Sequence, residues 1–185
     1  TATDDDATQL SDTQTVTITI TGSNVAPDIT VGTGDSAAAP LTADGNGLTT
    51  TGTLTVTDVN TTDVVTASVT TLNITGDLSD PLAPTAAQLE AMLTVTPADP
   101  AAILDGTETS DTLAWTFNSG SQNFDFLNAG DTLILEYTVT ATDDDATQLS
   151  DTQTVTITIT GSNVAPDITV GTGDSAAAPL TADGN

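Results

Sequence analysis

The sequence predicts an all-β fold, a β-sandwich of about seven short strands with one short crossover helix. Segments rich in Thr, Val and Ile alternate between apolar and polar positions, which is the period of a half-buried strand. Residues that favour turns separate these segments at regular intervals. Only one stretch of the 185 residues carries a helical pattern. These three observations together favour two packed sheets over any helical or mixed fold.

The expected strands share the same alternation. In residues 15–21, which read TVTITIT, Val16, Ile18 and Ile20 fall on one face, and residues 154–160 repeat this segment. Such apolar faces are expected to form the core, and Trp115 is most simply a core residue on the same grounds. Seven short strands separated by turns are typical of an immunoglobulin-type Greek-key sandwich. The predicted strands of one module are 28–32, 49–57, 64–75, 93–96, 112–117, 133–142 and 153–160.

The predicted helix lies in residues 84–93, which read PTAAQLEAML and are rich in good helix formers. Thr85 and Gln88 have the spacing of a capping box, in which each side chain satisfies a backbone N–H at the start of the helix. We therefore expect a helix of two to three turns in a crossover between strands.

The chain contains a long internal repeat. Residues 1–46 recur without change as residues 140–185, so that the period is 139 residues. This period is much longer than the roughly 20–50 residues of a solenoid repeat and has the size of an independent domain. Gly, Asn and Pro at 22–27 and 161–166 mark the module boundary. Residues 1–23 are thus interpreted as the C-terminal end of a preceding repeat, 24–162 as a complete module, and 163–185 as the start of the following repeat.

This division leaves residues 13–21 as a last strand without the strand that should precede it. An unpaired edge of this kind is expected to pair with another chain or to stay mobile.

The charge balance is extreme, with 26 acidic residues and no Lys, Arg or His. Nucleic acids and anionic membrane surfaces are excluded as partners because both require basic side chains, and no apolar run is long enough to be inserted in a membrane. The usual catalytic bases, anion-binding groups and thiols are missing as well, since the chain also has no cysteine. A carboxylate pair could serve a glycosidase, but we expect no enzyme and no small-molecule substrate.

Acidic loops are predicted to meet at one end of the module. In an immunoglobulin sandwich, the loop after 49–57 and the loop after 133–142 lie at the same pole as the module entry. Clustered carboxylates repel one another, and Ca²⁺ accepts six to eight oxygen ligands. The alternative is a solvated acidic loop in which Asp favours turns. The predicted Ca²⁺ ligands are Asn24, Asp28, Asp58, Asn60, Asp63, Asp143, Asp144 and Asp145, with Asn163 and Asp167 at the entry to the next module.

Two segments carry a resemblance to a known family. Residues 52–63, GTLTVTDVNTTD, and 135–168, LEYTVTATDDDATQLSDTQTVTITITGSNVAPDI, are similar to the VCBS and cadherin-like repeats of giant bacterial repeats-in-toxin (RTX) adhesins. Val164 stands where that family usually has an acidic residue. The resemblance implies a sandwich fold, calcium sites near module junctions, type I secretion and an extracellular spacer role at the bacterial cell surface.

The expected function is therefore structural. The module would extend a large adhesin, stiffened by calcium and projecting a distal binding domain for attachment and biofilm formation, and its partners would be neighbouring identical repeats. Two alternatives remain open at this point. One is a module that itself binds a ligand such as sugar or ice, and the other is a salt-adapted acidic surface-layer domain without specific calcium sites.

Overall fold

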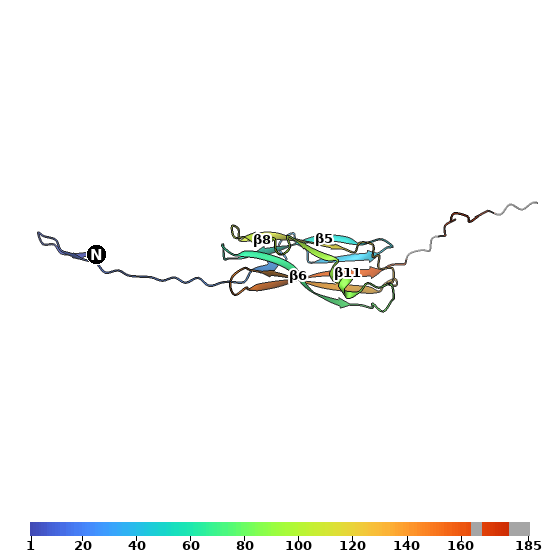
Figure 1. The fold of residues 1–185 in the computed structure, drawn as a ribbon, viewed down its shortest axis with the longest axis horizontal. Helices are drawn as coiled ribbons and strands as arrows, with labels where there is room; N and C mark the ends of the chain where they lie inside the picture. Colours follow the sequence, from blue (N-terminus) through green and yellow to red (C-terminus); the bar gives the residue numbers. More distant parts are fainter. Residues whose placement is uncertain (164–167, 178–185) are drawn as a thin grey trace, which may run out of the picture.

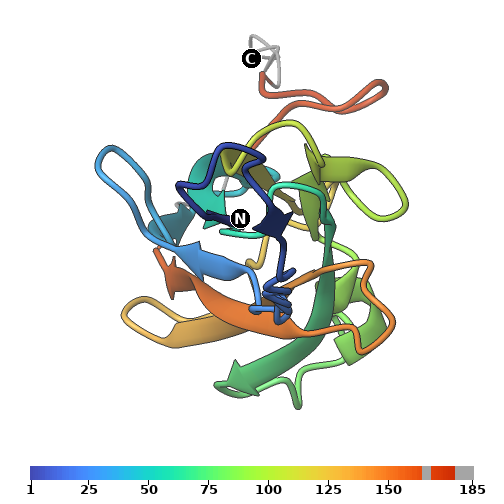
Figure 2. The same ribbon diagram turned by 90° about the vertical axis from the view of Figure 1, so that its left-hand side faces the viewer.

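Two β-sheets pack face to face in the computed structural model, which describes residues 1–163 and 168–177 (Figure 1). Figure 2 looks along the long axis from the side of the N-terminal tail and shows both sheets around the interior. The five-stranded sheet has the order β4 (Ala38–Ala43), β11 (Ser150–Gly161), β10 (Thr132–Thr142), β6 (Val64–Thr75) and β8 (Ala102–Asp105). The four-stranded sheet has the order β3 (Asp28–Thr30), β5 (Thr49–Thr57), β9 (Ser110–Asn118) and β7 (Leu93–Thr96).

The strand orders β3-β5-β9-β7 and β11-β10-β6 correspond to the ABED and GFC orders of an immunoglobulin sandwich. The described sandwich has nine strands, so the prediction of about seven was too low. The two additional strands are β4 and β8, both at sheet edges. β4 runs parallel to β11 and contains Pro40, which is tolerated at an edge because it removes only one ladder donor.

The core forms where the inward positions of the two sheets meet. In β10, each second residue from Leu133 to Ala141 is buried, and the residues between are only partly covered. The largest side chains in this interior are Trp115, Tyr137, Phe117 and Phe124. The rings of Phe117 and Tyr137 lie 6.4 Å apart between centroids with an interplanar angle of 60°, a tilted arrangement that favours aromatic contact.

The helix α1 (Ala86–Glu90) has the predicted capping box between Thr85 and Gln88. It is shorter than expected, because β7 takes over at Leu93 and limits the helix to five residues. Leu89 points into the core, and its backbone oxygen accepts a 2.7 Å hydrogen bond from the buried Tyr137 hydroxyl. The helix therefore closes one side of the sandwich and satisfies a buried polar group. Within the described ranges, no helix is long and apolar enough to cross a membrane.

An extended tail precedes the sandwich. It begins with a small hairpin of β1 (Ala2–Thr3) and β2 (Ser11–Asp12), and residues 13–21 form no strand. Val16, Ile18 and Ile20 are 79–90 % exposed, whereas the same three residues of the second copy are fully buried in β11. The tail enters at one end of the sandwich, and the chain leaves from the opposite end (Figure 1). Entry and exit at opposite poles allow modules to follow one another in a line.

Candidate metal centre

The candidate site lies at the pole where the tail enters, between three segments distant in sequence. The β5–β6 loop covers residues 58–63, the β10–β11 loop covers 143–149, and the entry segment covers 23–27. The first loop is a tight turn, in which Asp63 N donates to Asn60 O and Asn60 N donates to the Asp58 carboxylate at 2.8 Å. Asp favours such turns because its short side chain bonds to the backbone two residues on.

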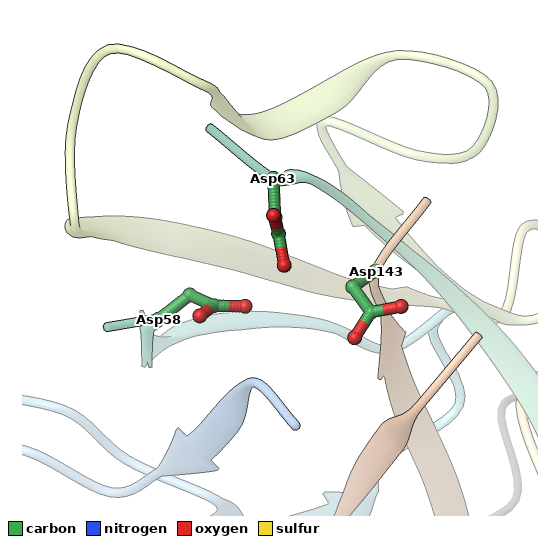
Figure 3. Close-up of side chains that lie close together, drawn as sticks. All are labelled: Asp58, Asp63 and Asp143. Atoms are coloured by element: carbon green, nitrogen blue, oxygen red, sulfur yellow. The ribbon is translucent and has the colours of Figure 1, made fainter. Parts of the chain in front are cut away.

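Asp58, Asp63 and Asp143 bring their carboxylates together in the interior of this pole (Figure 3). One carboxylate oxygen of each lies within 4.8 Å of the others. The three residues are only 4 %, 6 % and 2 % exposed. Burying unpaired carboxylates is costly, because they lose the solvation of water and repel one another. Since the chain has no Lys, Arg or His, no side chain of its own can compensate these charges.

Three buried oxygen atoms at this pole accept no hydrogen bond from the part of the chain that the structure describes. They are Asp58 Oδ2, Asp63 Oδ2 and Asn24 Oδ1. Buried polar atoms of folded proteins almost always have a partner. The remaining carboxylate oxygen of Asp58 is held by Asn60 N, and the two of Asp143 are held by Leu149 N at 3.0 Å and Asn24 Nδ2 at 2.9 Å. A hard cation that takes oxygen ligands is the partner that fits these unused acceptors.

The electrostatics of the site act most clearly on Asp63. Burial raises the pKa of its carboxyl above the ordinary value, and repulsion from Asp145, Asp58, Asp143 and Asp144 raises it further. A raised pKa means that the charged form is disfavoured where it stands. A divalent cation at this position would restore the charged form by neutralising the cluster.

The raised pKa of Asp63 predicts an unusual pH dependence of the metal-free protein. The folded state binds this proton more tightly than the unfolded state, so the free energy of unfolding should rise as the pH falls from neutrality through the raised pKa. The gain is complete below the unfolded value of about 3.9. In excess calcium the slope should reverse, because protons compete with the cation for the same oxygens.

Thermal unfolding followed by circular dichroism between about pH 7.5 and 4.5, with chelator and with calcium, measures both slopes. Asp35 does not obscure this window. Hydrogen bonds from the Thr53 and Thr55 hydroxyls lower the pKa of Asp35, and its stabilising effect is lost only at more acidic pH. A metal-free protein whose stability falls on mild acidification would contradict the prediction.

The structure places the other predicted ligands around or away from this centre. Asp144 and Asp145 lie at its exposed rim, where Asp144 Oδ1 accepts a 2.9 Å bond from Val64 N. Asn60 lies beside the centre, but its side chain binds the entry segment instead.

Two further predicted ligands do not lie at the centre. Asp28 is exposed at the start of β3, where it pairs with Thr57. Asn163 is exposed at the opposite pole, beyond β11, and Asp167 lies outside the described residues.

Sequence reasoning did not identify the backbone groups that orient the acidic side chains. Leu149 N donates to Asp143 Oδ1, and Thr109 O accepts from Asp58 N at 3.0 Å. The contact between Leu149 and Asp143 also occurs in the other copy of the repeat. In the tail, Leu10 N donates to Asp4 Oδ1 at 3.0 Å, although no sandwich surrounds this copy. The turn that presents Asp143 is therefore encoded locally, and the partners Asn24, Asp58 and Asp63 come from the fold.

No family model matches the chain, and no curated protein matches it in sequence. Several solved structures are similar to it. The PapD-like domain 7 of human CEP192 is 13 % identical, with 85 % of this chain and 99 % of that chain covered and a TM-score of 0.43. The CooA pilin subunit of enterotoxigenic Escherichia coli is 14 % identical, with coverages of 77 % and 100 % and a TM-score of 0.42. AggA, the major subunit of aggregative adherence fimbriae type I of Escherichia coli, is 14 % identical, with coverages of 76 % and 99 % and a TM-score of 0.39.

Proposed function

We propose that this chain is a spacer module from a tandem array, and that calcium bound at its entry pole stiffens the array. The observation that carries the proposal is the buried set of Asp58, Asp63 and Asp143, with orphaned oxygens that a cation would satisfy. The exact repeat with a period of 139 residues supports a tandem arrangement. The location of entry and exit at opposite poles supports an extended one (Figure 1).

Calcium fits the donor set better than magnesium does. The centre offers three carboxylates and the amide oxygen of Asn24, all from protein. Mg²⁺ usually retains several waters and takes few protein ligands, whereas Ca²⁺ accepts many oxygens in flexible geometry. Extracellular calcium modules bind with dissociation constants of roughly 10⁻⁴–10⁻³ M. Such a site would be empty in a low-calcium cytosol and filled outside the cell.

The proposed mechanism of stiffening runs through the entry segment. Asn24 lies in that segment, ahead of β3, and its side chain reaches the Asp143 carboxylate. A cation that also binds Asn24 Oδ1 would join the entering chain to the β5–β6 and β10–β11 loops. It would also relieve self-repulsion in a chain of net charge −26. Each occupied module would thus be more stable, and its joint to the preceding module would bend less.

The wider setting follows from the resemblance to VCBS and cadherin-like repeats. We place the module in a large, secreted RTX-type adhesin at the bacterial surface, where neighbouring identical repeats are its partners and a distal domain makes the attachment. The module itself contributes length and stiffness, and it does not grip the ligand.

The direct test is the melting temperature of the full chain in chelator, in calcium and in magnesium. Millimolar calcium is expected to raise it by several degrees through preferential binding to the folded state, and equal magnesium should raise it much less. Isothermal titration calorimetry should give a stoichiometry near one calcium ion per sandwich. A melting temperature that is the same in chelator and in calcium would exclude the calcium model.

A further inference from the structure

Asn60 fixes the entry segment through contacts that involve no cation. Its Oδ1 accepts a 2.9 Å hydrogen bond from Val25 N, and its Nδ2 donates to Ser23 O at 3.4 Å. One side-chain amide thus holds the backbone on both sides of Asn24, in the way that a neighbouring strand would. Asn60 is itself fixed, because its backbone N donates to Asp58 Oδ1 at 2.8 Å.

The exit of the module is anchored just as closely. Gly161 ends β11, where its N donates to Asp131 O at 2.9 Å and its O accepts from Gly130 N at 3.0 Å. The next residue, Ser162, donates its hydroxyl to Ala43 O. The chain is therefore held by the module that it leaves as far as Ser162.

Ser23 and Ser162 are the same residue of consecutive repeats, since the period is 139 residues. The exit anchor of one module reaches this serine through its hydroxyl, and the entry contacts of the next module begin at its carbonyl. In a tandem array no unanchored residue would remain between the two sets of contacts. We infer that the joint between repeats is a zero-length linker, and that Asn60 is the positioning residue that sets its geometry before any cation binds.

This inference rests on the tandem arrangement of the proposed function, but it separates two sources of stiffness. Asn24 connects the joint to the cation centre through its bond to Asp143 Oδ2 and its unused Oδ1. Asn60 connects the joint to the β5–β6 loop through neutral hydrogen bonds alone. Replacement of Asn24 should therefore leave the hydrogen bonds of Asn60 to the entry segment in place. Replacement of Asn60 should leave the link between Asn24 and the cation centre in place.

Amide hydrogen exchange of the full chain, followed by NMR in the presence of chelator, tests the role of Asn60. In the wild type, Val25 N–H should exchange more slowly than its unstructured rate, whereas Gly22 N–H in the exposed tail should not. Asn60→Ala should accelerate Val25 exchange about fivefold, the factor expected for loss of one hydrogen bond. Asn73→Ala is the matched control, because the Asn73 side chain on β6 donates to Glu136 on β10 and not to the entry segment, and this variant should leave the exchange rate of Val25 unchanged.

Asn24→Ala should reduce the effect of calcium on the melting temperature while Val25 stays protected in chelator. The role of Asn60 is overturned if Val25 exchanges as an unprotected amide in the metal-free wild type, a measurement that does not depend on any variant folding. It is also overturned if Asn60→Ala and Asn73→Ala give the same Val25 rate. If calcium leaves the wild-type melting temperature unchanged but Asn60→Ala still accelerates Val25 exchange, the calcium model fails and the positioning role of Asn60 stands.

Discussion

Asp63→Asn is expected to raise the melting temperature of the metal-free protein and to abolish the further rise caused by calcium. In chelator, the wild-type carboxylate is buried among other carboxylates, and its pKa is raised by burial and by their repulsion. An amide of the same shape removes that charge, and its N–H₂ group can donate to the unused Asp58 oxygen. In calcium, the variant lacks a charged ligand and should bind the ion weakly. Most substitutions of buried groups destabilise under all conditions, so this opposite pair of effects is diagnostic.

The size of the calcium effect follows from mass action. Calcium at about tenfold above its dissociation constant stabilises the wild type by about 1.4 kcal/mol, and at about hundredfold by about 2.7 kcal/mol. For a domain of this size these values correspond to roughly 4–8 °C in melting temperature. Differential scanning calorimetry of the wild type and Asp63→Asn, each in chelator and in calcium, measures all four states.

Asp4→Asn is the matched control, since it removes one negative charge from a copy of the Asp143 turn that lacks the other acidic partners. It should retain the wild-type response to calcium. If Asp63→Asn lowers the melting temperature in chelator and retains the calcium response, the buried centre does not bind the ion.

Three strands could be predicted with their observed bounds. Residues 49–57, 64–75 and 93–96 form β5, β6 and β7 with the predicted bounds. β4 and β8 could not be predicted by the same argument. β4 reads AAPLTA, which has little β-branching and contains a proline, and β8 reads AILD, where the consecutive buried residues Ile103 and Leu104 break the alternation. Both strands depend on pairing with a long neighbour, β11 or β6, and this tertiary contact is invisible in local sequence.

The pole was predictable from the sequence, but the choice among its acidic residues required the sandwich. Asp143, Asp144 and Asp145 are equivalent by composition, yet only Asp143 is buried. The period of the strand explains this, because Ala141 is the last inward residue of β10 and the next inward position is 143. Asp58 follows the inward Val56 in the same way, and Asp63 precedes the inward Val65. Extending the alternation by one step beyond each strand would have selected all three.

Asn60 shows where that reasoning ends. As an oxygen-bearing residue in an acidic loop, it fits a metal ligand by type and spacing. The strand pattern places the entry segment at the same pole, but it does not identify Ser23 O and Val25 N as the partners of the Asn60 side chain. Backbone contacts between loops depend on how the two sheets are stacked, and residue types alone do not encode them.

Gly52→Val is expected to destabilise the sandwich by about 3 kcal/mol, near the upper end of the usual range for overpacking a core. Gly52 lies opposite Trp115 in the β5–β9 ladder, and the indole ring covers the space where a Cβ would stand. The ring cannot easily move aside, because it is buried and its Nε1 donates to Ser36 O at 2.7 Å. Urea unfolding followed by circular dichroism measures the loss, since this probe also serves variants without Trp115.

Thr51→Val serves as the control on the exposed face of the same strand, and it should change the free energy of unfolding by no more than about 0.5 kcal/mol. A double-mutant cycle sharpens the argument. Trp115→Leu alone should destabilise, but in its presence Gly52→Val should cost much less, because the smaller side chain leaves room for the valine. Additive losses in the cycle, or equal effects of Gly52→Val and Thr51→Val, would show that the ring does not rest on Gly52. A double-mutant loss smaller than the sum of the two single losses would instead show that this glycine is required by the packing of the only tryptophan in the sequence.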